Sequence, residues 1–156
     1  MSGVGARLLR AALLLSLGAA PATAGNIPAV GGSWELKISC KGIAGQAPST
    51  RKQTLFLPIV DGLGGDIQAG AGDTGAMIGY VLYESAKPEK VRITLAGCSV
   101  SSLNGLVLQA AGKIVGDAGR LKGTAIFLDA SGETAEICKA KLERTNAMAP
   151  PVLNCL

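Results

Sequence analysis

Short runs in which apolar and polar residues alternate dominate the chain after residue 30 and set its fold class. In the clearest run, Trp34 to Lys41, the residues Trp34, Leu36, Ile38 and Cys40 share one parity, and charged or polar residues share the other. A period of two is that of a β-strand with one buried and one wet face. Helical periodicity is almost absent from the rest of the chain. The pattern therefore predicts an all-β protein.

Seven further runs have a similar character, and turn-forming residues such as Asn104-Gly105 and Ser131-Gly132 separate them. These residue types supply the positive φ or fixed geometry that hairpin connections need. About eight short strands joined by hairpins form an antiparallel meander, which closes into an up-and-down barrel or folds into a β-sandwich. The runs expected to form strands are 34–41, 53–60, 66–70, 77–84, 90–97, 105–115, 122–129 and 134–144.

A register for closing a barrel can be read from the first and last runs. Cys138 and Arg144 share one face of the last run, and Cys40 and Trp34 share one face of the first. If the two strands pair antiparallel with Cys40 opposite Cys138, the same register places Trp34 beside Arg144. The inner faces then match in apolar character.

The outer face of this register carries like charges. It sets Glu35 against Glu143 and Lys37 against Lys141, which is unfavourable, although the diagonal pairs partly relieve the repulsion. Basic residues gather along these two strands and are interleaved with glutamates. We interpret them as a solvated face of mixed charge rather than a binding surface. The basic residues concerned are Lys37, Lys41, Lys139, Lys141 and Arg144.

Four cysteines, Cys40, Cys98, Cys138 and Cys155, point to two disulfides. The chain has no histidine and no C-x-x-C pair, so a zinc site would need four widely scattered thiolates. The register above favours Cys40 with Cys138 and leaves Cys98 with Cys155, while the other two connectivities remain open.

Residues 1–24 have the layout of a cleavable secretion signal. Arg7 and Arg10 precede an apolar run, and Ala22-Thr23-Ala24 ends it. The alternative is an uncleaved anchor, but the apolar stretch is shorter than the ~20 residues of a membrane-spanning helix. We expect residues 25–156 to form one domain in the periplasm or outside the cell, with no membrane span in the mature chain. This part has 13 basic and 11 acidic residues, a net charge of +2, which does not favour nucleic acid.

Gly32-Ser33-Trp34 resembles the Gly-x-Trp start of the calycin barrels: lipocalins, avidin-like proteins and certain small bacterial protease inhibitors. In lipocalins an arginine late in the last strands packs over that tryptophan, and Arg144 occupies such a position here. The resemblance implies a small barrel that binds an apolar ligand in its mouth, or a protein through its loops.

Catalysis, metal ions and cofactors are not expected. Without histidine, the usual activator of serine and cysteine nucleophiles is missing. Asp61, Asp66 and Asp73 lie among glycines in a spacing that fits neither the EF-hand loop nor the nonapeptide calcium repeat, so they are interpreted as turn formers. The chain is therefore predicted not to be an enzyme.

Three aromatic residues, Phe56, Tyr80 and Tyr83, are candidate contact residues. Phe56 alternates with two leucines, so it either faces outward beside Pro58 or, if the alternation is broken there, belongs to the core. The run from Met77 to Tyr83 is apolar on both parities, which suits a strand covered on both sides. We expect an exported binding protein for an apolar ligand or a protein partner, the alternative being a non-catalytic structural or accessory protein of the cell envelope.

Overall fold

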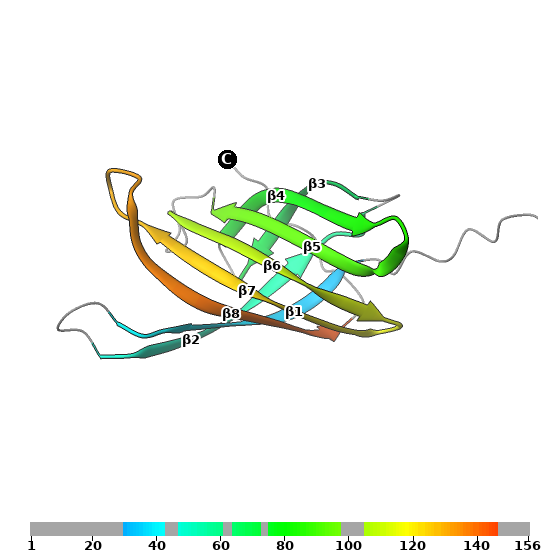
Figure 1. Cartoon of the computed structure of the whole chain (residues 1–156), viewed down its shortest axis with the longest axis horizontal. Helices are drawn as coiled ribbons and strands as arrows, with labels where there is room; N and C mark the ends of the chain where they lie inside the picture. The colour runs from blue at the N-terminus through cyan, green and yellow to red at the C-terminus, as the bar shows by residue number, and fades with distance from the viewer. Residues whose placement is uncertain (1–29, 43–46, 61–63, 73–74, 98–104, 147–156) are drawn as a thin grey trace, which may run out of the picture.

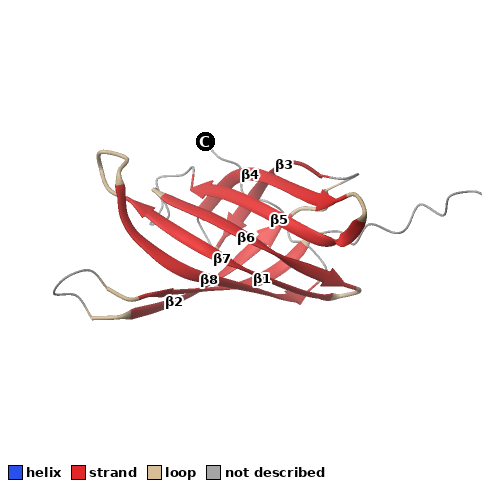
Figure 2. Ribbon diagram, viewed as in Figure 1, coloured by secondary structure: helices blue, strands red, loops and turns tan. Residues whose placement is uncertain are grey.

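A computed structural model describes residues 30–42, 47–60, 64–72, 75–97 and 105–146. The predicted secretion signal 1–24, Cys98 and Cys155 lie outside these residues. Eight antiparallel strands follow one another around a closed barrel in chain order, with no helix among the described residues (Figures 1 and 2). The strands are β1 (Gly32–Cys40), β2 (Ser49–Leu57), β3 (Gly64–Ala71), β4 (Gly75–Glu84), β5 (Lys87–Gly97), β6 (Leu106–Val115), β7 (Ala118–Leu128) and β8 (Thr134–Asn146).

The predicted meander of eight strands is confirmed, and it closes as a barrel rather than folding as a sandwich. The largest difference in strand bounds is at β2, which begins at Ser49 instead of residue 53 and ends at Leu57. Residues Ser49 to Lys52 are all exposed, so no apolar alternation marks them in the sequence. They are extended because each pairs with β1, where Cys40 lies opposite Ser49.

The seam between β1 and β8 has the predicted register. Trp34 lies opposite Arg144, and Lys37 lies opposite Lys141. A disulfide joins Cys40 to Cys138 across the seam, 98 residues apart in sequence. Pairing the first strand with the last removes both sheet edges that an open meander would expose.

Inward-facing side chains from all eight strands fill the barrel with one apolar core. Leu36, Leu55, Ile93 and Leu108 in this core are fully shielded from solvent. Strand β7 approaches β6 closely at Gly123, where an added Cβ would lie 1.8 Å from the carbonyl oxygen of Gln109. Only glycine fits there, because the neighbouring backbone approaches too closely for any side chain.

One end of the barrel, the tryptophan end, is closed by Trp34. The indole is fully buried, and its Nε1 donates to the carbonyl oxygen of Val30 at 2.9 Å. The guanidinium of Arg144 lies 5.5 Å from the centroid of the indole ring and donates to the carbonyl oxygens of Gly31 and Gly116. This geometry combines a cation–π contact with hydrogen bonds that fix the segment before β1.

Tyr83 also lies at the tryptophan end and faces inward. Its hydroxyl oxygen accepts a hydrogen bond from the backbone N–H of Val30 at 2.8 Å. Burial raises the pKa of the Tyr83 hydroxyl, an effect that the Val30 hydrogen bond and the charge of Arg144 partly offset. Burial likewise lowers the pKa of Arg144, opposed by the negative charge of Asp117.

Gly119 leaves the space that the indole occupies. An added Cβ would lie 2.4 Å from the Cη2 atom of Trp34. We expect Gly119→Ala to displace the ring and to lower the free energy of unfolding by about 1–3 kcal/mol. Chemical denaturation measures the loss, and the emission of the single tryptophan reports the displacement.

Gly65→Ala is the matched control for this substitution. Its added Cβ would meet only the Val60 side chain, at an ordinary 3.6 Å. The control should change stability by less than ~0.5 kcal/mol. Equal stability changes in the two variants would show that Gly119 is not needed for the indole to fit.

Removing the seam disulfide tests its role in closure. The double variant Cys40→Ala/Cys138→Ala leaves no free thiol at the seam, and we expect it to lose about 2–5 kcal/mol of stability. The reason is that the bond joins strands 98 residues apart and restricts the unfolded chain. Urea unfolding, with the slope fitted separately for each protein because the released unfolded chain is less compact, measures the loss. A change below ~1 kcal/mol would show that strand pairing alone closes the seam.

Tyr83→Phe removes the partner of the Val30 N–H and should cost about 1–2 kcal/mol at pH 8. The raised pKa of Tyr83 means that its contribution is fully present below pH ~10 and is lost as pH rises through the folded-state value. The stability difference between the two proteins should therefore shrink in alkali. Denaturation at pH 8 and at pH values above 10 checks this, and a constant difference would contradict it.

Candidate functional site

A cavity of about 400 Å³ lies toward the other end of the barrel, the disulfide end, where β1 and β7 finish. Its walls come from β1, β2, β6 and β7, strands far apart in sequence that closure brings together across the interior. This volume is within the range of sites for small organic ligands. The lining residues are Leu36, Ile38, Arg51, Lys52, Gln53, Leu106 and Phe127.

Apolar side chains line one part of the cavity. Leu36, Ile38 and Leu106 belong to the main core, and each is at most 4 % exposed. The ring of Phe127 packs against this core and is partly buried. A ligand here would meet a rigid apolar surface, because these side chains are held by the packing beneath them.

Polar groups of β2 line another part. Arg51 and Gln53 share the parity of the buried Leu55, so they turn toward the barrel axis, and they lie opposite Ile38 and Leu36 of β1. The guanidinium carbon of Arg51 lies 5.9 Å from the centroid of the Phe127 ring. This contact places a positive charge beside the apolar lining.

The extension of β2 past its neighbour β3 gives Arg51 this position. Among the described residues, β2 pairs with β3 at Leu55 and Phe56, next to a backbone hydrogen bond from Gly72 to Thr54, whereas it pairs with β1 along its whole length. The hairpin of β1 and β2 therefore projects beyond the body of the barrel (Figure 1). Arg51 lies on that projection and reaches across to β7.

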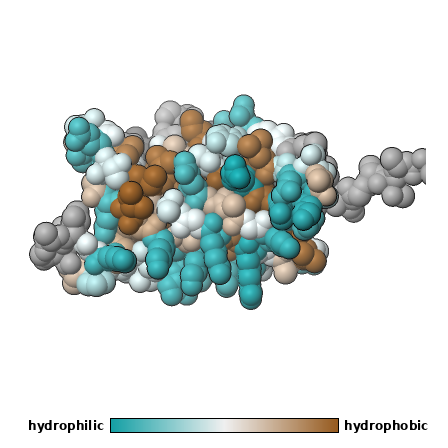
Figure 3. All heavy atoms as spheres, viewed as in Figure 1, coloured by the Kyte–Doolittle hydropathy of each residue, from teal (hydrophilic) through white to brown (hydrophobic). Residues whose placement is uncertain are grey.

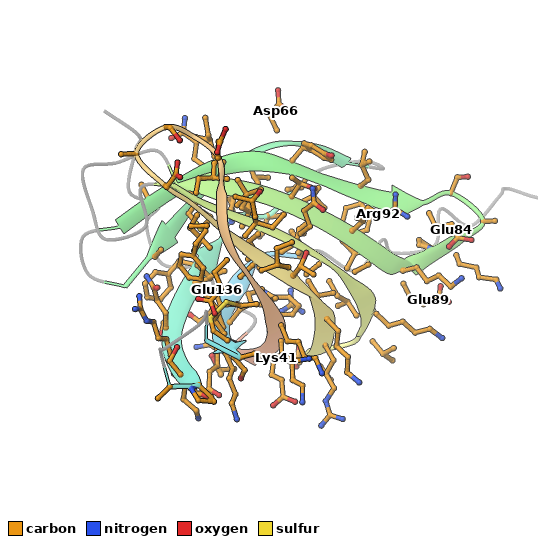
Figure 4. All side chains as sticks on the ribbon, turned by 60° about the vertical axis from the view of Figure 1, so that its left-hand side comes forward. Lys41, Asp66, Glu84, Glu89, Arg92 and Glu136 are labelled. Carbon is orange, nitrogen blue, oxygen red and sulfur yellow. A yellow bond between two sulfur atoms is a disulfide. The ribbon has the colours of Figure 1, made fainter. Side chains whose placement is uncertain are left out.

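The disulfide and Glu136 lie at the same end (Figure 4). Potential ligand atoms of Cys40, Glu136 and Cys138 lie within 4.8 Å of one another. Both sulfurs are consumed by the disulfide, and the Glu136 carboxylate accepts a hydrogen bond from the backbone N–H of Gly42 at 3.1 Å. The group holds the end of β1 in place and is not a metal site in this form.

The three candidate contact residues, Phe56, Tyr80 and Tyr83, differ in whether they face solvent or the core. Tyr80 faces outward and is 42 % exposed, and Phe56 faces outward and is half-buried, opposite Gly70. The ring of Tyr83 faces the core and is 7 % exposed, so it differs from the other two in lying inside the barrel. Both parities of β4 are apolar, so hydropathy alternation in the sequence could not show which tyrosine faces inward and which faces outward.

Sequence reasoning missed the polar lining of the cavity. Arg51 and Gln53 lie in and beside a stretch without apolar alternation, so no periodicity assigned them to a face. Phe127 received no role, although its parity with the buried Ala125 places it inside. The shared parity with Ala125 was the feature of the sequence that could have placed Phe127 inside the barrel.

The outer face of β4 exposes large apolar side chains. Ile78, Tyr80 and Leu82 are 42–48 % exposed, so the described residues leave this side of the strand uncovered. In Figure 3 the apolar surface is broken into separate patches between hydrophilic side chains. Strand β4 is thus buried on one side only.

The described residues include no helix with the length and apolar character needed to cross a membrane. No protein-family model matches the sequence, and comparison with curated proteins found no match. Architecture and cavity chemistry are therefore the basis for assigning a function.

Proposed function

We propose that this protein binds a small amphipathic ligand in the cavity at the disulfide end. The observation that carries the proposal is the cavity of about 400 Å³, with the apolar Ile38, Leu106 and Phe127 on one part of its lining and Arg51 on another. Small-molecule sites combine apolar walls with placed polar groups, and this cavity offers both kinds of lining.

The charge of Arg51 narrows the ligand class. A carboxylate or sulfonate beside this guanidinium can accept charge-assisted hydrogen bonds, and Gln53 can add a neutral one. An apolar tail would cover Phe127 and Ile38 and gain by leaving water. A short-chain organic acid with an apolar body fits both requirements.

The architecture supports a calycin-type binding barrel. Eight antiparallel strands close in chain order, and Arg144 lies over the Trp34 ring as the resemblance at Gly32-Ser33-Trp34 implies. In this arrangement the tryptophan closes one end of the barrel and the ligand enters from the other. The cavity lies toward the end opposite Trp34.

An extracytoplasmic location is part of the proposal. The disulfide between Cys40 and Cys138 suits an oxidising compartment, and residues 1–24 have the pattern of a secretion signal. We place the mature protein in the periplasm or outside the cell.

The alternative is a structural or accessory role in the cell envelope. Ile78, Tyr80 and Leu82 on the outer face of β4 favour it, because they offer an apolar strip to another protein. In that case the cavity would stay empty and β4 would lie in an interface.

A fluorescence titration with 8-anilinonaphthalene-1-sulfonate tests the binding proposal, since this probe joins a sulfonate to an apolar aromatic body. We expect saturable binding that decanoate displaces. Arg51→Gln should weaken binding by about tenfold, because the sulfonate loses a charged hydrogen-bond donor.

Arg120→Gln is the matched control. It removes the same charge from the outer face of β7, where Arg120 pairs with Glu143, and should change affinity by less than about twofold. Near-ultraviolet circular dichroism must stay native, because partly unfolded proteins also bind this dye. Equal affinities of the two variants would contradict the site, and a defined oligomer that Leu82→Gln dissociates would favour the alternative.

A further inference from the structure

Basic side chains form a band around the outside of the barrel. In one cross-strand row, seven outward-facing residues on seven strands lie directly opposite one another, from β4 through β8 and β1 to β2. Two of them, Leu82 and Ala111, are uncharged. The other five, here called the basic band, are all exposed: Arg92, Lys122, Lys141, Lys37 and Lys52.

Four lysines of the band are consecutive cross-strand neighbours. Lys122 lies opposite Lys141, Lys141 opposite Lys37, and Lys37 opposite Lys52. Like charges directly opposite each other in a sheet destabilise it. The folded protein therefore holds these lysines together at a cost in stability.

Acidic neighbours neutralise little of this charge. Lys52 pairs with Glu35 at 3.1 Å, and Glu143 pairs with Arg120 rather than with a band residue. Within the described residues, Lys37, Lys122 and Lys141 have no ion pair. Figure 3 shows hydrophilic side chains projecting in a row along the edge of the barrel where β8 and β1 meet.

Acidic residues are also present near the band. Glu35 and Glu143 lie on β1 and β8, and Arg92 lies on the same side of the molecule as Glu84 and Glu89 in Figure 4. The predicted mature chain has a net charge of only +2, so the band is a local feature and not the result of a generally basic composition. A local array of this kind is complementary to an anionic partner.

A hollow of about 430 Å³ lies between Arg92 and Lys122. The small side chain of Ala111 separates these two cations across β6, which leaves the space open. The hollow also offers hydroxyl and amide groups and one exposed ring. These residues are Tyr80, Thr94, Gln109 and Thr124.

The shape of the band selects the class of partner. Its cations lie on five strands from β5 round to β2 of a closed barrel of eight, so they occupy more than half of the circumference. A flat bilayer cannot contact Arg92 and Lys52 together, whereas a flexible linear polyanion can follow the curve. Single-stranded nucleic acid needs a row of exposed rings, and the hollow has only Tyr80.

We propose that the basic band binds a linear acidic polysaccharide, with one sugar residue seated in the hollow against Tyr80. Carboxylate or sulfate groups of the chain contact the band, and sugar hydroxyls hydrogen-bond to Thr94, Gln109 and Thr124. The hollow is on the outer surface and shares no lining residue with the interior cavity. Among the band residues Lys52 alone borders that cavity, so the two proposals can be tested independently at Lys122 and Lys141.

Binding of polygalacturonate oligosaccharides to the protein with its disulfide intact tests the proposal by isothermal titration calorimetry. We expect binding that weakens as salt rises. Lys122→Gln/Lys141→Gln should weaken it about tenfold, because two direct charge contacts are lost. Lys52 is left unchanged because it also borders the interior cavity.

Lys41→Gln/Lys87→Gln is the control with the same change in net charge, at exposed positions outside the band. It should alter affinity by less than about twofold. The band variant should be at least as heat-stable as the original protein, because it relieves lysine repulsion, so failure to fold is not expected. Equal losses in both variants, absence of polygalacturonate binding, or preferential binding of single-stranded DNA or phosphatidylglycerol vesicles would overturn the proposal.

Discussion

The pairing of β1 with β8 is the constraint on which the rest of this structure depends. It converts a meander with two exposed edges into a closed barrel and decides which parity of every strand faces inward. Because side chains alternate with a period of two, a shift by one residue would bury Lys37 and expose Leu36. The disulfide between Cys40 and Cys138 excludes that shift covalently.

This constraint could be predicted because its signals lie within two short segments. Cys40 and Trp34 share a parity in one, Cys138 and Arg144 share a parity in the other, and a single register matches both pairs. The existence of eight strands followed from alternation and turn residues in the same way. The beginning of β2 at Ser49 could not be predicted in this way. Ser49 to Lys52 are extended because they pair with β1, and this pairing leaves no pattern in the local sequence.

The candidate site was much less accessible from sequence than the fold. The cavity is formed by β1, β2, β6 and β7 together, and its polar lining, Arg51 and Gln53, comes from a strand without alternation at that point. In β4 both parities are apolar, so hydropathy could not tell that Tyr80 faces outward while Tyr83 is buried. Such positions are decided by distant partners and not by neighbours in sequence.

The outer face depends on the same register as the core. Placing Trp34, Leu36 and Cys40 inside necessarily places Lys37 outside, opposite Lys141. If only β1 and β8 are considered, the repulsion between Lys37 and Lys141 is a small local cost that nearby glutamates can offset. The structure adds Lys122 on β7 and Lys52 on β2 in the same cross-strand row, so the repulsion recurs on four adjacent strands. A single like-charge pair can be a by-product of core packing, whereas these four lysines make three such pairs in one row. The core fixes where these outer positions lie but not which charged side chain occupies them, and the choice of lysine at all four supports the proposal of an anionic partner.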